Sequence, residues 1–391
     1  MTTAPIPLSR ASAGEGRGGG ATRDAGGATQ DRLTATYRIV SDPASIKARA
    51  HSIAVEQSVE MPLDAIDDAA IHYQIVGKVE SIQDRGNGQF DVRIALAIAT
   101  VGDDAGQFLN MVFGNTSLHN DVILLDVEVP AALSTVFPGP HHGIEGLRHR
   151  ANAFNRALTC SALKPQGLPP ARLAQLAERF ARGGIDFIKD DHGLADQSYS
   201  PFAERVTRIA QSIANTGHGT RYVPSLSGDL DQMRRQIEAA CSASIDAVLI
   251  APMLAGWSNV QSLIRQFPEI AFFAHPTMGG AARIAPELLI GKLFRLLGAD
   301  AVIFPNHGGR FGYTPDTCRR LAETARAPLN GIRPSVPVPA GGMTLDRVPE
   351  LLDFYGPDAM LLIGGSLLAA RDRLTEATAA FTSAVAQHIY R

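Results

Sequence analysis

The strongest constraint on the fold is a set of short apolar segments that recurs from residue 157 to the end of the chain. Helical stretches such as PARLAQLAERFARG (170–183) fill the gaps between them. Buried parallel strands read as continuous apolar runs, so eight strand–helix units match a (β/α)8 TIM barrel better than an open sheet. The eight segments are ALTCSALK (157–164), IDFIKDD (185–191), RYVPSLS (221–227), DAVLIAPM (246–253), AFFAHP (271–276), AVIFPN (301–306), VPVPAGG (336–342) and AMLLIGG (359–365).

The N-terminal third has a different pattern. Residues 1–33 are rich in Gly, Ala, Thr and Arg and hold almost nothing that could build a core, which predicts a disordered tail. From Thr34 the chain reads as a strand, a helix (45–60), two extended runs (70–82 and 89–100), another helix and a last strand (122–129). We therefore expect a disordered tail over 1–33, a small α+β domain over 34–135 and a barrel over 140–391.

Composition excludes several classes of function. The 391 residues are 45% hydrophobic and carry a formal net charge of −3, with basic and acidic residues interspersed, so neither nucleic acid nor a membrane surface is an expected partner. No apolar run approaches the roughly 20 residues needed to cross a bilayer, and the N-terminus does not resemble a secretory signal peptide. The three cysteines are widely spaced and odd in number, which is typical of a reducing cytoplasm.

Polar residues gather at the C-terminal end of the expected barrel strands. Active sites of TIM barrels lie at that end, so the pattern predicts an active site there. The residues concerned are Lys164, Lys189, Asp191, His192, Ser225, Ser227, His275, Asn306, His307 and the glycine pairs 341–342 and 364–365.

The richest cluster is KDDH at 189–192. Alternate side chains of a strand share a face, so Lys189 and Asp191 are expected to point one way and Asp190 the other. One reading is an ion pair at the barrel rim, since two carboxylates near a lysine normally hold it as an ammonium. The other is a lysine carrying a carbamate formed with CO2, whose oxygen, with Asp191 and His192, would bind a hard cation such as Mg2+.

Two further strand ends could carry chemistry. Lys164 would face the same cavity, and a lysine in such a pocket is a candidate proton carrier, although a surface lysine would need no partner. His275 ends the fifth strand, where a lone histidine is either a satisfied core residue or a catalytic one; its position favours catalysis.

The glycine pairs close the last two strands. Barrels often bind a phosphate on backbone N–H groups at this place, because only glycine lets the ligand approach so closely. Gly341, Gly342, Gly364 and Gly365 therefore indicate a phosphorylated substrate. The alternative is a pair of tight turns.

These motifs together resemble a known family. GGIDFIKDDH is similar to the GGxDFxKDDE signature of ribulose-bisphosphate carboxylase (RuBisCO) large chains and RuBisCO-like proteins (form IV), and other motifs follow in the family's order. They are VEQS (55–58), FGN (113–115), FPGPHHGIEGLR (137–148), ALKPQG (162–167), HPTMGG (275–280), PVPAGGM (337–343) and LLIGGS (361–366).

The resemblance implies a ferredoxin-like N-terminal domain, a TIM barrel, and a homodimer whose active site lies at the subunit interface. It implies one Mg2+ per subunit, held by carbamylated Lys189, Asp191 and His192, with Lys164, Lys189 and His275 as catalytic residues. It also implies that Asn115 contacts the substrate in the partner's site, and that Gly341, Gly342, Gly364 and Gly365 bind phosphate.

The departures from the family pattern narrow the chemistry. The loop after the sixth strand, FPNHGGRFGYT (304–314), lacks the lysine that steadies the CO2 adduct in carboxylases, which argues against CO2 fixation. Pro276 and Ile303 replace residues of a second phosphate site, which favours a substrate with one phosphate, and Gln166 replaces the second lysine of the family's KPK motif. His192 stands where the family has a metal-binding glutamate, and imidazole suits softer metals than Mg2+.

The sequence therefore predicts a Mg2+-dependent enzyme that forms an enediolate on a keto-sugar phosphate. Because KDDH differs from the KDDE of the methionine-salvage enolases, we expect a lyase or hydrolase of carbohydrate catabolism, acting by decarboxylation or transcarboxylation and hydrolysis on a 3-oxo-isoapionate 4-phosphate type substrate. The alternatives are a 2,3-diketo-5-methylthiopentyl-1-phosphate enolase or a methylthioribulose-1-phosphate isomerase of methionine salvage, and a non-catalytic protein that binds a sugar phosphate.

Overall fold

The computed structural model describes residues 31–390, so the expected disordered tail lies almost wholly outside the described residues. The first sheet is antiparallel, with strand order β2-β3-β1-β4. Its long central pair, β1 and β3, runs in register from Arg32↔Ala97 to Val40↔Gln89. The elements of this part are β1 (Arg32–Val40), α1 (Ile46–Glu56), β2 (Lys78–Gly86), β3 (Gln89–Ala97), α3 (Ala105–Phe113) and β4 (Val122–Glu128).

One local prediction in this part is wrong. The run 70–82 was expected to be extended throughout, but its first half forms the short helix α2 (Ala69–Gln74). The carboxylate of Asp68 accepts a hydrogen bond from the Ala70 backbone N–H, at 2.7 Å, and so caps the first turn. A local cap therefore outweighed the apolar pattern.

The second sheet is parallel and contains all eight expected strands, in the order β7-β6-β5-β12-β11-β10-β9-β8. Hydrogen bonds between the ends of this order close it: Leu226 N–H donates to the Leu249 carbonyl, and Leu249 N–H donates to the Pro224 carbonyl, both at 2.8 Å. The predicted α/β class with a TIM barrel is confirmed. The strands are β5 (Leu158–Leu163), β6 (Phe187–Asp190), β7 (Arg221–Val223), β8 (Ala247–Ile250), β9 (Ala271–Ala274), β10 (Ala301–Pro305), β11 (Val336–Ala340) and β12 (Met360–Leu362).

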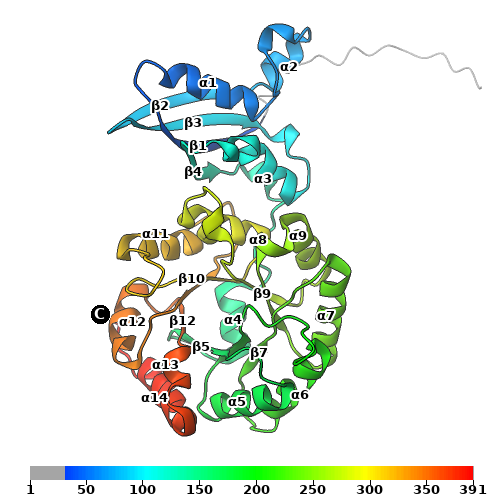
Figure 1. Cartoon of the computed structure of the whole chain (residues 1–391), viewed down its shortest axis with the longest axis vertical. Coiled ribbons are helices and arrows are strands. Elements are labelled where there is room, and N and C mark those ends of the chain that lie inside the picture. Colours follow the sequence, from blue (N-terminus) through cyan, green and yellow to red (C-terminus); the bar gives the residue numbers. More distant parts are fainter. Residues whose placement is uncertain (1–30, 391) are drawn as a thin grey trace, which may run out of the picture. The chain divides into compact units, whose positions relative to one another are not determined.

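Helices lie outside the ring of strands (Figure 1). The stretch 286–298 forms a π-helical segment (Glu287–Leu293) that continues into α10 (Phe294–Leu297). The other long helices of the barrel are α5 (Pro170–Arg182), α6 (Phe202–Ala214), α7 (Leu230–Ser242), α9 (Trp257–Gln266), α11 (Pro315–Arg326), α12 (Val348–Tyr355) and α14 (Leu374–Ala386).

Each barrel strand contributes at least one side chain to a buried inner cluster, so the barrel is filled rather than hollow. Helix α4 (Gly143–Ala151) closes the N-terminal end, because its Leu147 is fully buried and belongs to the same cluster. Figure 1 shows α4 within the outline of the ring. The C-terminal ends of the strands are therefore the end at which a site can form. The strand members of the inner cluster include Cys160, Phe187, Val223, Leu249, Phe273, Ile303, Val338 and Leu362.

Candidate active site

The KDDH segment divides its side chains between the two faces of β6. Phe187 points into the barrel, so by alternation Lys189 and Asp191 do the same, while Asp190 points toward the helices. The Asp190 carboxylate, 0% exposed, lies 3.2 Å from Arg205 Nε and accepts a hydrogen bond from Tyr222 Oη at 2.7 Å. Asp190 is therefore part of the scaffold, and only its two neighbours face the mouth of the barrel.

Lys189 is a buried amine without a carboxylate in direct contact. Its side chain is 3% exposed, and Nζ donates to the Asp190 backbone carbonyl at 2.9 Å. Burial lowers the pKa of Lys189, and the nearby ammonium of Lys164 adds to this effect. A neutral amine is the form that reacts with CO2, so the environment of Lys189 suits a carbamate.

One carboxylate oxygen of Asp191 contacts two side chains, those of Lys164 and His192. Lys164 Nζ donates to its Oδ1 at 2.9 Å, and His192 Nδ1 lies 3.2 Å from the same oxygen. Burial alone would raise the pKa of Asp191, but hydrogen bonding to His192 and Lys164 holds it well below the usual range. Asp191 is therefore a carboxylate at all ordinary pH values.

His275 lies at the C-terminal end of β9 and faces the same residues. Its ring stacks on that of His192, with centroids 4.3 Å apart and planes 9° from parallel. Burial lowers the pKa of His275 far below its usual range, so the ring is neutral. Thr277 holds His275, through its backbone N–H and its hydroxyl, both at Nδ1.

The structure thus brings together five of the predicted site residues: Lys164, Lys189, Asp191, His192 and His275. Sequence reasoning missed Thr277, which positions His275, because nothing but its adjacency marks it. Gln166, which the sequence marked only as a departure from the KPK motif, rests its side-chain amide against the backbone of Gly193 beside the KDDH segment. A methyl group at Gly193 would meet Gln166 Nε2 at 1.8 Å, so this glycine allows the contact.

The residues can be tested for their fit to Mg2+. Within residues 31–390, no three His, Cys, Asp or Glu side chains are grouped as a metal site, so binding would need a carbamate on Lys189. Asp191 Oδ2 receives no hydrogen bond from the described residues and is a hard oxygen donor. A carbamate oxygen on Lys189 and Asp191 Oδ2 are therefore the donor types that Mg2+ prefers, and the residues fit.

The two glycine pairs differ. Gly341 and Gly342 have φ of 84° and 66°, and a methyl group on Gly342 would meet Gly309 Cα at 2.5 Å. Turn geometry and the close approach of the loop after β10 therefore require these two glycines. Gly364 and Gly365 have no positive φ, and a methyl group on either would meet no atom within 4 Å. Neither turn geometry nor a close contact therefore requires glycine at these two positions. Their backbone is uncovered beside the mouth of the barrel.

Asn115 lies in the N-terminal part, in a 3-10 turn after α3. Its Nδ2 donates to Glu56 Oε1 and to Glu60 Oε1, both at 2.9 Å. Its hydrogen-bond partners therefore come from the N-terminal part of the same chain, and the five residues at the barrel mouth are not among them.

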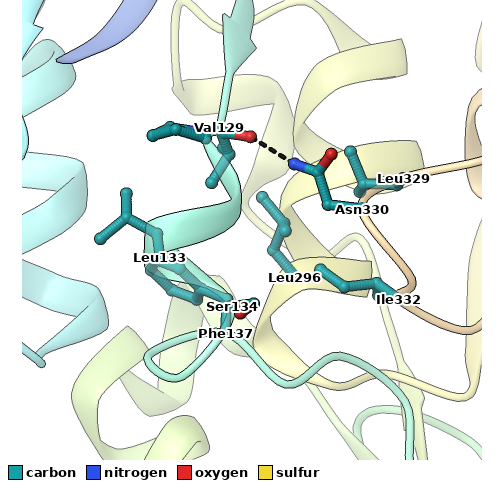
Figure 2. Close-up of a pocket in the computed structure, with 9 residues that line it drawn as sticks. Val129, Leu133, Ser134, Phe137, Leu296, Leu329, Asn330 and Ile332 are labelled. Atoms are coloured by element: carbon teal, nitrogen blue, oxygen red, sulfur yellow. Dashed lines mark hydrogen bonds between the residues drawn. The ribbon is translucent and has the colours of Figure 1, made fainter. Parts of the chain in front are cut away.

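Two hollows lie away from these residues. Figure 2 shows an apolar crevice between the segment that enters the barrel and the loop before β11, where Asn330 Nδ2 donates to the Val129 carbonyl at 2.6 Å. A cavity of about 310 Å³ lies beside Asp126 and Lys292, which form an ion pair at 2.8 Å. Neither contains any of the predicted site residues, so the chemistry is argued from the barrel mouth.

Comparison with known proteins identifies the family. A family model described as the ribulose bisphosphate carboxylase large chain, catalytic domain, matches residues 143–386. The chain belongs to the RuBisCO large-chain family. The crystal structure of a RuBisCO-like protein from Rhodopseudomonas palustris superposes with a TM-score of 0.87 at 49% identity, covering 93% of this chain and all of that one.

Two curated relatives carry names that bear on function. This chain is 61% identical to the 5-methylthioribulose-1-phosphate isomerase of Rhodospirillum rubrum over 361 residues, 91% of this chain and 96% of that protein. It is 29% identical to the 2,3-diketo-5-methylthiopentyl-1-phosphate enolase of Geobacillus kaustophilus, over 90% and 91% of the two chains. The predictions of the family and of an enzyme are confirmed.

The prediction of the substrate is not supported. The names of these relatives do not support action on a 3-oxo-isoapionate 4-phosphate type substrate; they fit the methionine-salvage alternative instead. The difference between KDDH and KDDE was the wrong guide, because it separates this chain from the enolases only and says nothing of an isomerase. Among residues 31–390, no helix has the length and apolar character needed to cross a membrane.

Proposed function

We propose that this chain isomerises 5-methylthioribulose 1-phosphate, or a closely similar keto-sugar monophosphate, through an enediolate. The observation that carries the proposal is the 61% identity, over 91% of the chain, to a protein of that name. The residues gathered at the barrel mouth are of the kinds that such a reaction needs.

The chemistry requires a proton to leave a carbon next to a ketone while negative charge grows on the ketone oxygen. We propose that Mg2+ binds to carbamylated Lys189 and Asp191; when bound, it would polarise the ketone and stabilise that charge. His192 is the third residue that could contact the ion, although its imidazole is a poorer match.

The chain's own residues supply the rest. Lys164, held on Asp191 at 2.9 Å, places an ammonium at the mouth, where it can donate a hydrogen bond to a substrate oxygen. Neutral His275 presents a ring fixed by Thr277. We propose that the phosphate binds over the loops of Gly341, Gly342, Gly364 and Gly365, since open backbone beside Gly364 and Gly365 leaves room for it.

We further propose a homodimer in the cytoplasm, in which Asn115, with its Glu56 and Glu60 partners, completes the site of the partner subunit. The support is the family membership and the exposed position of this amide and its two carboxylates. Light scattering on the purified protein would give the mass.

The test is direct. Purified protein is mixed with 5-methylthioribulose 1-phosphate in deuterated buffer and followed by proton and phosphorus NMR, either with Mg2+ and bicarbonate or with a chelator and CO2-free buffer. We expect conversion to an isomeric ketose phosphate, with deuterium at carbon, only in the first condition. Binding without exchange in both conditions would favour the non-catalytic alternative, and conversion of the corresponding diketone alone would favour the enolase.

A further inference from the structure

We infer that the cavity of about 310 Å³ beside Asp126 and Lys292 is a second binding site, separate from the barrel mouth, for an α-amino acid with an apolar side chain. This inference does not depend on the proposed isomerisation. It is carried by the walls of the cavity, by the balance of charge on its lining, and by the hydrogen-bonding capacity that the lining groups leave unused.

Two structural elements form walls of the cavity. One is β4, which contributes Asp126, and the other is the π-helical segment Glu287–Leu293. Backbone hydrogen bonds join β4 to the residues just before that segment: Leu124 N–H donates to the Arg283 carbonyl, and Ala285 N–H donates to the Leu124 carbonyl, both at 2.9 Å. The hollow therefore lies between elements that are tied together, not between loose loops.

The π-helical wall is itself unusual, because π-helical turns are rare and occur frequently at functional sites. The segment packs against α11 through Gly291, where a methyl group would meet the Leu321 carbonyl oxygen at 3.0 Å and Thr324 Cβ at 3.1 Å. Glycine thus allows a close approach, and Thr324 of α11 lies on the lining. None of the residues gathered at the barrel mouth belongs to this segment, so a ligand in the cavity is the better reason for its irregular backbone.

The charged groups on the lining are balanced. Asp126 and Glu287 supply two carboxylates, and Lys292 and Arg295 supply two cations. A lining without net charge favours a ligand without net charge, whereas a phosphate or a polyamine would leave an excess of one sign. Because charges of both signs line the cavity, a zwitterion matches it best.

Arg295 favours a carboxylate on the ligand. The residue is 1% exposed, and burial lowers its pKa to about 10, so it remains charged at neutral pH. Its guanidinium donates to backbone carbonyls only, those of Thr324, Ala327, Ile332 and Arg333. A buried cation without an anionic partner is destabilising, and a carboxylate bound in the cavity would offset this.

The other charged groups keep bonding capacity that the described residues do not use. Lys292 Nζ donates to Asp126 Oδ1 at 2.8 Å, which leaves two of its three N–H groups. Asp126 Oδ2 receives no hydrogen bond from residues 31–390, and neither does Glu287 Oε2, because Arg320 binds the other oxygen of Glu287. The ligand's carboxylate can therefore accept from Lys292, and its ammonium can donate to Asp126 and Glu287.

The size and the apolar part of the lining define the rest of the ligand. Leu125, Leu288 and Leu329 lie on the same lining and would remove a hydrocarbon side chain from water. The volume of about 310 Å³ is at the lower end of the range of roughly 300 to 1,000 Å³ for small-molecule sites. An amino acid fits such a space better than a nucleotide does.

The experiment is isothermal titration calorimetry on the whole chain, with L-leucine as the probe. Three analogues each lack one part of it: 4-methylpentanoate lacks the ammonium, 3-methylbutylamine lacks the carboxylate, and glycine lacks the apolar side chain. Wild type is compared with Lys292→Met and with two controls. Lys47→Met changes an exposed lysine of α1, and Lys189→Met changes the barrel mouth. Circular dichroism shows whether each variant is folded.

We expect one L-leucine to bind per chain with a Kd on the order of 1 mM or tighter, which a ligand of about nine heavy atoms can reach. Each analogue should bind at least roughly 10-fold more weakly, and so should L-leucine to Lys292→Met, because each change removes a charge-assisted hydrogen bond or the apolar contact. Both controls should bind L-leucine as wild type does.

Three outcomes would overturn the inference. The first is no heat of binding from L-leucine at concentrations about 20 times the expected Kd. The second is 4-methylpentanoate binding as tightly as L-leucine, which would make the cavity an anion site. The third is an affinity that is lost in Lys189→Met and kept in Lys292→Met, which would place the amino acid at the barrel mouth. The analogue series on wild type decides the first two even if Lys292→Met does not fold.

Discussion

The two ends of the barrel use carboxylates in opposite ways. At the N-terminal end, Asp186 accepts hydrogen bonds from Arg156, from the Thr159 backbone N–H and from the Thr159 hydroxyl, all between 2.7 and 2.9 Å. Asp300 likewise accepts from three backbone N–H groups there. At the C-terminal end, Asp191 keeps one oxygen free of hydrogen bonds from the described residues.

The difference shows what each end is for. Carboxylates with every oxygen engaged tie α4 and the strand starts together, and they have no capacity left for a ligand. Asp191 and Lys189 are buried with bonding capacity to spare, an arrangement that costs stability and persists where a ligand completes it. Substitutions at the two ends should therefore separate activity from stability.

The largest effect should follow Lys189→Met. The variant cannot form a carbamate, so we expect deuterium exchange into substrate to fall on the order of 1,000-fold or more. An apolar side chain in place of a buried amine should leave the melting temperature unchanged or higher. Lys47→Met, at an exposed position in α1, is the matched control. Exchange close to that of wild type would show that Lys189 is only part of the scaffold.

Asp190→Asn tests whether position along the barrel or the direction of the side chain decides the effect of a substitution. Asp190 lies at the catalytic end, but its side chain points outward to the helices. The substitution leaves the fully buried Arg205 without its anionic partner, so we expect the free energy of unfolding to fall by about 3–5 kcal/mol. Asp191→Asn should do the reverse: exchange is lost and stability changes little. Denaturant unfolding of both variants, beside exchange measurements, checks this. Equal effects in the two variants would mean that the faces of β6 are not functionally distinct.

Asp186→Ala tests the N-terminal end. Arg156, which is partly exposed, and Thr159 lose their acceptor, and we expect the free energy of unfolding to fall by about 2–3 kcal/mol. The rate per folded molecule should equal that of wild type, because the substitution lies at the end opposite the site. A fall in that rate measured below the unfolding transition would contradict the division of labour between the ends.

The different roles of the two barrel ends could be predicted from the sequence only in part. Apolar runs revealed all eight barrel strands, and the alternation within KDDH correctly separated Asp190 from Lys189 and Asp191. Contacts between distant loops could not be predicted, because no local pattern encodes them. The stack of His192 on His275 and the approach of Gly309 to Gly342 are of this kind. Local capping also overrode pattern, as Asp68 did in starting α2.

The glycine pairs show a related limit. From the sequence, both pairs were predicted to bind phosphate, because each is a Gly-Gly dipeptide at the end of a strand. The backbone separates them: Gly341 and Gly342 have left-handed φ values that any fold with this turn would demand, whereas Gly364 and Gly365 do not. Residue types alone do not reveal φ. A glycine required by turn geometry therefore cannot be distinguished from one that leaves room for a ligand until the structure is known.

The smallest predicted effect concerns the backbone of the two ends. In the loops before β5 and β11, left-handed φ values belong to asparagines, Asn152, Asn155 and Asn330, which tolerate them. At the catalytic end the residue is Met278, with φ 65° and ψ −2°, in a turn closed by the Gly279 N–H to Pro276 carbonyl hydrogen bond. That is the third position of a type II turn, where glycine is the usual residue.

Met278→Gly should therefore raise the free energy of unfolding, by about 0.5–1 kcal/mol, because the strain at φ 65° disappears and the methionine side chain is 54% exposed. Thermal unfolding beside Asn155→Gly, at an exposed asparagine with φ 60°, which should change stability by only a few tenths of a kcal/mol, measures the difference. The turn also positions Thr277 against His275, so the added freedom of glycine should lower exchange slightly even as stability rises. A gain in both would mean that the strain at the catalytic end has no part in holding His275.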